Sequence, residues 1–400
     1  MRAVIIGGGA AGLMAAITAA GRGISTTLLE RQNRVGRKLL ATGNGRCNLT
    51  NLKLSPDNYH GAPAPFISSV LDTFGVADTL ELFQSLGLIT VAEDSGRVYP
   101  LSDQAGSVVD VLRFAAEAAG VTIRTEFDAT SVKPTKSGFK VCSPSESILA
   151  DKVIVCCGGM AGGKLGGTRS GYELLQSLGH RVTKLYPVLV QLKTDNTWVR
   201  SLKGVRADAA VTLKRGDEVL AQSCGEVQFA DYGVSGPAIF EISRAAAVEK
   251  GELTVHLDLL RTLDFAQIQD MIRMRQQSMP SLTLENLLTG MVHNRLGRTM
   301  LRYAGYDLNS PVSTLKPNDI KKIAAALGNF ALPVTGNQGF DGAQVTAGGI
   351  RTDEFDPTTM ESKLVPGLYA AGEVLDVDGD CGGYNLQWAW ASGRLAGMSL

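Results

Sequence analysis

The chain has 400 residues, more than one hydrophobic core usually supports, which favours two or three domains. Hydrophobic residues make up 44% and charged residues 20%, as in ordinary globular proteins, and no stretch has the roughly 18 to 20 uninterrupted apolar residues of a membrane span. Lys+Arg and Asp+Glu both number 39, and this balance argues against a nucleic-acid-binding protein, a class that normally carries a basic excess.

The first thirty residues predict a strand, a glycine turn, a helix and a second strand. Ala3 to Ile6 is a short apolar run typical of a buried parallel strand. The next six residues, 7–12, fit the pattern G-x-G-x-x-G, and Leu13 to Ala20 favours an alanine-rich helix. Thr26 to Leu29 predicts the second strand, which ends at Glu30. This order is typical of a dinucleotide-binding βαβ unit, whereas the glycines alone would also fit a chance turn.

Each glycine of the motif has a physical task. Gly7 permits the tight turn, Gly9 lets a pyrophosphate approach the backbone, and Gly12 lets helix and strand pack closely. Glu30 lies 18 residues after Gly12, where a carboxylate accepts hydrogen bonds from ribose hydroxyls and disfavours the 2′-phosphate of NADP. This unit does not distinguish FAD from NAD.

The segment from Val35 to Asn51 is dense in small, polar and basic residues. Asn44, Arg46 and Asn48 can donate hydrogen bonds, and glycines at 43 and 45 allow close backbone approach. The segment therefore suits a polar ligand with phosphate or carbonyl oxygens. A solvated surface loop has a similar composition and stays as the alternative.

Residues 153–159 predict a strand and turn that re-enter the nucleotide-binding domain. Cys156 and Cys157 end this strand; the favoured interpretation is two small buried residues, with a redox pair as the alternative. Gly158 to Lys164 fits G-x-x-x-x-G-K, but Leu165 stands where an ATP-binding loop needs Ser or Thr, so nucleotide hydrolysis is not expected.

The pattern of hydrophobic residues changes in the middle of the chain. Short alternating or apolar runs predict a β-rich inserted domain over residues 187–262, with an embedded helix near 233–247. Helical spacing predicts a small helical domain and return segment over 263–341. The methionines Met271, Met274 and Met279 are expected to pack in that domain.

The C-terminal segment repeats the pattern of strand, acidic turn, glycine turn and helix. Gly372 and Glu373 end a short strand, and Gly382-Gly383 opens a helix at Tyr384. A helix start presents N–H groups to an electron-rich acceptor. A site built from both ends of the chain fits a large cofactor, and a simple NAD dehydrogenase has no need of the second element.

These motifs resemble the bacterial YhiN/BaiN-like family of FAD-binding oxidoreductases, also called the aminoacetone oxidase family. The matching segments span nearly the whole chain: GGGAAGLMAA (7–16), LERQNRVGRKLLATGNGRCNLTN (29–51), GRVYP (96–100), GGMAGGKLGGTRSGYELLQSLGH (158–180), TAGGI (346–350) and LYAAGEVLDVDGDCGGYNLQWAWASG (368–393). The resemblance implies an α/β fold: a Rossmann-like, glutathione-reductase-like FAD-binding domain at 1–186 and 342–400, with the β-rich insertion and helical cap between.

The resemblance also implies roles for individual residues. Glu30 would hold the adenosine ribose, the turn at 7–12 the pyrophosphate, and the 383–386 stretch the pyrimidine edge of the flavin. The full set of expected FAD contacts is Gly7, Gly9, Ala11, Gly12, Glu30, Arg31, Lys38, Gly43, Asn44, Gly45, Arg46, Cys47, Asn48, Ala129, Gly158, Gly372, Glu373, Gly382, Gly383, Tyr384, Asn385 and Leu386. Ala129 is expected on a strand that follows Glu126, where it would border the adenine.

The favoured function is hydride transfer between the flavin and a small organic substrate, with NAD(P)H as a candidate electron donor. Cys47 is a weak candidate for a catalytic thiol. The alternatives are an FAD-dependent RNA-modifying enzyme and a flavin-binding sensor without turnover. The six cysteines fit no zinc pattern, the four histidines are scattered, and the expected location is the cytoplasm, with no metal and no membrane partner.

Overall fold

The computed structural model describes residues 1–400, which form two compact units. The first unit contains Met1–Pro187 and Ala343–Leu400, and the second contains Val188–Gly342. Each unit has its own hydrophobic core. The first unit is thus assembled from both ends of the chain.

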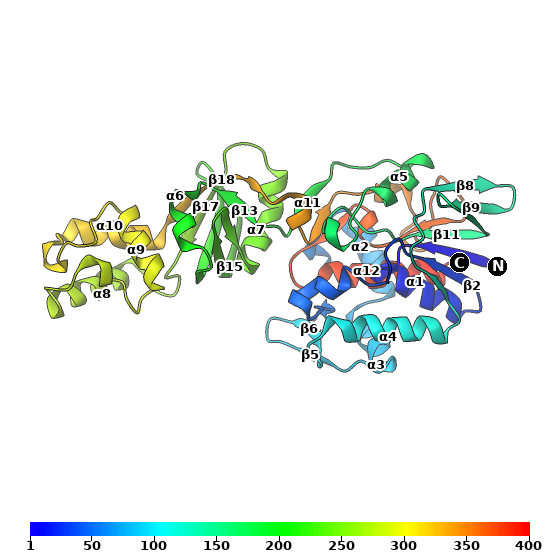
Figure 1. Cartoon of the computed structure of the whole chain (residues 1–400), viewed down its shortest axis with the longest axis horizontal. Coiled ribbons are helices and arrows are strands. Elements are labelled where there is room, and N and C mark those ends of the chain that lie inside the picture. The colour runs from blue at the N-terminus through cyan, green and yellow to red at the C-terminus, as the bar shows by residue number, and fades with distance from the viewer. The chain divides into compact units, whose positions relative to one another are not determined.

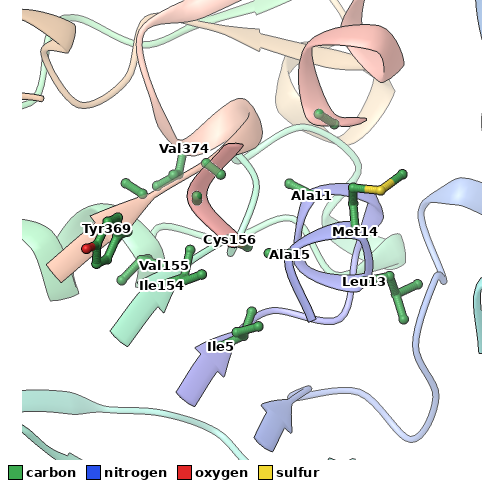
Figure 2. Packing of buried hydrophobic residues seen from close by; sticks show 14 of the residues in the cluster. Ile5, Ala11, Leu13, Met14, Ala15, Ile154, Val155, Cys156, Tyr369 and Val374 are labelled. Atoms are coloured by element: carbon green, nitrogen blue, oxygen red, sulfur yellow. The ribbon is translucent and has the colours of Figure 1, made fainter. Parts of the chain in front are cut away.

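The first unit contains a five-stranded parallel sheet, which lies near both chain termini (Figure 1). Its strands, in spatial order, are β20 (Leu368–Ala370), β11 (Lys152–Val155), β1 (Arg2–Ile6), β2 (Ser25–Leu29) and β7 (Thr122–Arg124). These strands are short and mostly buried, as apolar strands covered on both faces are. Figure 2 shows buried core residues of β1 (Ile5), β11 (Ile154) and α1 (Leu13).

Helices and smaller sheets complete this unit. The helices are α1 (Ala10–Gly21), α2 (Ala64–Thr73), α3 (Val76–Ser85), α4 (Ala105–Ala118), α5 (Ser170–Ser177) and α12 (Tyr384–Met398). The smaller sheets contain β8 (Ser131–Thr135), β9 (Gly138–Cys142) and β10 (Ser147–Ala150); β3 (Thr50–Asn51), β5 (Thr90–Ala92) and β6 (Arg97–Pro100); β4 (Tyr59–Gly61) and β21 (Val377–Gly379); and β12 (Tyr186–Val188) and β19 (Val345–Ala347).

The second unit is a closed six-stranded barrel with helices. The barrel strands, in spatial order, are β13 (Leu192–Thr194), β16 (Gly233–Ser235), β15 (Glu218–Ala230), β14 (Arg206–Arg215), β17 (Thr254–Asp258) and β18 (Phe330–Asn337). The helices are α6 (Asn196–Val199), α7 (Pro237–Val248), α8 (Phe265–Ser278), α9 (Asn294–Tyr303), α10 (Pro317–Gly328) and α11 (Gly339–Gly342). Barrel and helices share one hydrophobic core, across residue 262 where the sequence predicts a boundary.

The predicted helix near 233–247 is present as α7, but it begins at Pro237 because β16 occupies Gly233–Ser235. The expectation that three methionines pack in the helical part is wrong. Met271, Met274 and Met279 are not packed but 39%, 67% and 53% exposed, because α8 buries its other face through Ile268 and Ile272.

Candidate functional site

The turn between β1 and α1 can be built only from glycine at two positions. Gly7 has a φ of +108°, and a Cβ there would overlap the carbonyl oxygen of Cys156 at the end of β11. A Cβ on Gly12 would overlap the carbonyl oxygen of Gly7. Figure 2 shows Cys156 beside Ala11 and Ala15 of α1. Strand ends and helix start therefore meet at backbone contact distance, as the motif predicts.

The start of α1 has no protein cap. The N-cap residue is Gly9, no side chain accepts from the first turn, and a Cβ on Gly9 would meet nothing within 4 Å. The first N–H groups of a helix lack partners within the helix, and the helix dipole adds partial positive charge there. The turn containing Gly7, Gly9, Ala11 and Gly12 therefore leads into an uncapped helix start, the arrangement that suits an anion such as a phosphate group.

Glu30 lies against the same turn. Its Oε2 accepts the N–H of Gly8 at 2.8 Å, and its Oε1 accepts the N–H of Gln32 at 2.7 Å. These bonds fix the carboxylate at the end of β2. Each carboxylate oxygen has a further lone pair, which suits a sugar hydroxyl.

Two further predicted residues lie around this end of the site. The N–H of Phe127 donates to the carbonyl of Glu30 at 3.0 Å, which brings the segment that contains Ala129 toward Glu30. Ala129 is buried but lies in the loop between β7 and β8, so its expected place on a strand is wrong. Arg31 donates to the carbonyl of Gly166 at 3.3 Å.

An ion pair joins the two ends of the chain. Lys38 Nζ lies 2.7 Å from Glu373 Oε2, and Glu373 Oε1 accepts the N–H of Thr346 at 2.9 Å. Gly372, with a φ of +78°, lies so close to α1 that its Cβ would be 2.9 Å from the Cβ of Ala11. Gly158, also at positive φ, has open space where a Cβ would be. Residues from both ends of the chain thus meet here.

The loop of residues 39–48 has an unusual backbone. Gly43 and Asn44 both have a φ of +56° and Cys47 a φ of +62°. Asn44 and Gly45 are exposed, whereas Arg46 lies 4.0 Å from the ring centre of Tyr99 and pairs with Asp103 and, at 3.1 Å, with Glu93.

Cys47 does not fit a catalytic role. Its side chain is fully buried, and burial raises the pKa of the thiol to about 12. A buried, protonated thiol is a poor nucleophile. Burial likewise raises the pKa of Cys157 to about 12 and that of Cys156 well above its ordinary value. Both follow the end of β11; Cys156 is buried as expected, whereas Cys157 is only partly buried. All six cysteines are free.

The start of α12 forms a second helix start. Gly383 is its N-cap with a φ of +101°, and no side chain caps the helix. A Cβ on Gly383 would lie 2.6 Å from the carbonyl oxygen of Thr50 and 2.9 Å from Asn48 Oδ1. Asn48 is 9% exposed, and its Oδ1 has no hydrogen-bond partner in the protein. An unpaired buried amide oxygen is costly and marks a place where a ligand donor fits.

Hydrogen bonds fix the loop that leads into α12. Asn385 Oδ1 accepts the N–H of Gly379 at 2.8 Å, and its Nδ2 donates to the carbonyl of Gly379 at 2.7 Å. Asn51 Nδ2 donates to the carbonyl of Gly382 at 2.9 Å, and the Tyr59 hydroxyl donates to the carbonyl of Tyr384 at 2.9 Å. These bonds fix the turn at Gly382 and the first residues of α12, next to Asn48.

The two helix starts lie on one side of a close helix contact. A Cβ on Gly393 of α12 would overlap the carbonyl oxygen of Ala11 in α1. Tyr384 begins α12 nine residues earlier, about 13 Å along the axis at 1.5 Å per residue. One extended molecule can therefore reach both helix starts. The parallel sheet and these paired helix starts define a dinucleotide-binding protein of the flavoprotein type.

Comparison with known proteins agrees with this class. The family model described as "HI0933-like protein Rossmann domain" matches residues 1–399, so the chain belongs to this family. It is 42% identical to the 3-dehydro-bile acid delta(4,6)-reductase of Clostridium scindens, over 99% of this chain and 98% of that protein. It is 30% identical to the ribosomal RNA dihydrouridine synthase of Escherichia coli, over 100% of this chain and 97% of that protein.

Among solved structures, the fold resembles the 3-ketosteroid delta1-dehydrogenase of Sterolibacterium denitrificans. The TM-score is 0.51 at 13% identity, over 99% of this chain and 98% of that chain. Family and fold together identify the protein as an FAD-dependent oxidoreductase, which confirms the predicted enzyme class. The expectation that nucleic acid is no partner is not supported, because one relative is a ribosomal RNA enzyme.

No group of three or more His, Cys, Asp or Glu side chains is placed to hold a metal ion. No helix has both the length and the apolar character needed to cross a membrane.

Proposed function

We propose that this protein saturates a carbon–carbon double bond conjugated to a carbonyl group in a small cyclic substrate, with NAD(P)H as electron donor. The observation that carries the proposal is the 42% identity, over nearly the full length of both chains, to a protein named as a reductase of a 3-dehydro, delta(4,6) compound. In that nomenclature a ketone stands next to ring double bonds. The name dihydrouridine synthase likewise describes saturation of a ring double bond next to a carbonyl.

The residues of the first unit fit FAD at both ends of the molecule. We assign the pyrophosphate to the uncapped start of α1, the adenosine ribose to Glu30, and the ribityl region to Lys38 and Glu373. We assign the pyrimidine edge of the flavin to Asn48 and the start of α12, where Oδ1 lacks a partner and the helix dipole favours negative charge. When bound, the cofactor supplies two-electron hydride chemistry.

The proposal is tested with purified, FAD-loaded protein under anaerobic conditions. NADH or NADPH is added first, and bleaching of the flavin absorbance reports reduction. The reduced protein is then mixed with cyclohex-2-enone, a 3-oxo-4-ene steroid or a saturated ketone. We expect both enones, but not the saturated ketone, to restore the oxidised flavin spectrum and yield the saturated product. A reduced flavin that neither enone oxidises contradicts the proposal.

An RNA substrate is the second candidate, favoured by the 30% and 28% identity to two ribosomal RNA dihydrouridine synthases. The zero net charge of this chain speaks against it, because RNA-binding proteins normally carry a basic surface. Incubation of the reduced protein with unmodified ribosomal RNA, followed by nucleoside mass spectrometry, separates the two. Dihydrouridine formed at a rate above that of enone reduction would favour RNA.

We also place the protein in the cytoplasm. Six free cysteines with no disulfide are typical of a reducing compartment.

A further inference from the structure

A histidine–aspartate pair lies beside the start of α12. His60 is on β4, and Asp380 is in the loop between β21 and α12. The ring Nε2 of His60 lies 2.9 Å from Asp380 Oδ1. The pairing of β4 with β21, in which His60 is in register with Asp378, brings together residues that are 320 positions apart in the sequence.

Asp380 is fixed from several directions. Its N–H donates to the carbonyl of Asn58 at 2.9 Å, and Asn58 Nδ2 donates to its Oδ2 at 3.3 Å. Its carbonyl accepts from Asn385 Nδ2 at 3.3 Å, in the first turn of α12. The carboxylate is thereby held in place and can orient the imidazole ring, as the orienting acid of a catalytic histidine does.

The His60 ring has one nitrogen engaged and one accessible. Its side chain is 32% exposed, that of Asp380 is 42% exposed, and Nδ1 has no partner in the protein. His180, the other histidine of this unit, is the opposite case: it is buried, with Nδ1 bonded to Glu354 at 2.9 Å and Nε2 to Ser362 at 3.0 Å. Only His60 of these two can reach a substrate.

Two other proton-bearing groups near this turn are less suitable. The Cys47 thiol is fully buried. The Tyr59 hydroxyl is buried and already donates to the carbonyl of Tyr384. The pair formed by His60 and Asp380 adjoins the loop assigned above to the flavin edge, and it is accessible.

We propose that His60, oriented by Asp380, is the proton donor to the substrate during double-bond reduction. This assignment rests on the proposed function. In the protonated ring, Nε2–H donates to Asp380 and Nδ1–H faces outward. When bound, reduced FAD would supply a hydride to one alkene carbon, and NAD(P)H would supply the two electrons that restore the cofactor. As the π electrons move to the neighbouring carbon, His60 would give its Nδ1 proton to that carbon to form the second C–H bond, and water would return a proton to Nδ1.

The test separates proton transfer from flavin binding. FAD-loaded wild type, His60→Gln, His60→Ala and Asp380→Asn are reduced with dithionite and mixed with cyclohex-2-enone in a stopped-flow instrument. His256→Gln is the matched control, because His256 is partly exposed and lies in the second unit, bonded to Asn329. FAD dissociation constants, from flavin fluorescence, and melting temperatures are measured for every variant.

We expect His60→Gln to slow flavin oxidation by the enone roughly 100-fold, within the range typical of a lost general acid. Asp380→Asn should slow it less, the control should match wild type, and added imidazole should restore part of the rate to His60→Ala. FAD affinity and melting temperature should change little in the His60 variants.

Three outcomes overturn the assignment. Wild-type rates in His60→Gln would show that another group donates the proton. A loss of FAD affinity or melting temperature that accounts for the slower rate would make His60 a structural residue. If wild-type reduced flavin is inert toward the enone while its spectrum shows bound FAD, the proposed function fails and takes this assignment with it.

Discussion

Asn48 is a buried polar residue whose hydrogen-bonding capacity is not fully used within the protein. Its Oδ1 is buried without a hydrogen-bond partner, next to the N-cap of α12. A buried unpaired acceptor costs about 1–3 kcal/mol. The unpaired oxygen lies beside the proposed flavin edge. Binding sites commonly contain such locally destabilising groups, because these groups are needed for recognition of the ligand.

Replacement of Asn48 by Leu should therefore act in opposite directions in the two forms of the protein. Without FAD, we expect the melting temperature to stay the same or rise, because the unpaired oxygen is gone. With excess FAD, we expect a smaller ligand-induced rise than in wild type, because stabilisation by a ligand follows its affinity. Differential scanning fluorimetry of both forms measures the two effects.

Asn51→Leu is the matched control. Asn51 is also buried, but its side chain donates to Gly382 and accepts from Lys53. We expect Asn51→Leu to lower the melting temperature of the FAD-free protein. If Asn48→Leu behaves in the same way, Asn48 is a structural residue and not a ligand contact.

At the scale of elements, the contact between α1 and α12 sets the spacing of the two helix starts. The position of a Cβ on Gly393 overlaps backbone atoms of Ala11, which cannot move aside as a side chain could. Gly393→Ala should push the helices apart, with a loss of about 1–3 kcal/mol in the free energy of unfolding. FAD affinity should fall as well, because Ala11 belongs to the proposed pyrophosphate turn.

Gly106→Ala tests whether this effect is specific. Gly106 is also a helical glycine, in α4, but a Cβ there meets nothing within 4 Å. The substitution should be neutral or stabilising by up to about 1 kcal/mol, from helix propensity alone. Urea unfolding and FAD titration of both variants give the comparison; equal behaviour would contradict the role given to the helix contact.

The helices and strands differ in how far the sequence predicts them. The strand, glycine turn and helix at each end of the chain were predictable, because close backbone approach leaves glycine as the only residue that fits, as at Gly7 and Gly12. The exposure of Met274 was not predictable, because α8 carries apolar residues on two faces and only tertiary packing selects one. The burial of Cys47 and the pairing of His60 with Asp380 depend on non-local packing, which leaves no local pattern.

At the scale of the whole molecule, the proposed cofactor site belongs to one unit although its sequence is split. Residues 1–187 and 343–400 share one hydrophobic core, and the second unit has another. The chain leaves the first unit after β12 and returns near β19, and these two strands pair in one small sheet. Exit and return points are therefore close together, so a short linker can replace the insertion.

We expect a protein in which residues 190–341 are replaced by a short Gly-Ser linker to fold and to bind FAD. Every residue assigned above to the cofactor lies in the first unit, and domains with their own cores generally fold independently. The measurements are circular dichroism, the visible spectrum of the purified protein and the FAD dissociation constant, which should stay within about tenfold of that of the full chain. The same deletion with Asn48→Leu should bind FAD more weakly. A well-folded but colourless protein that FAD does not reconstitute would contradict this expectation. It would show that the first unit has a complete core but lacks some of the residues that bind the cofactor, so that the second unit contributes to the site.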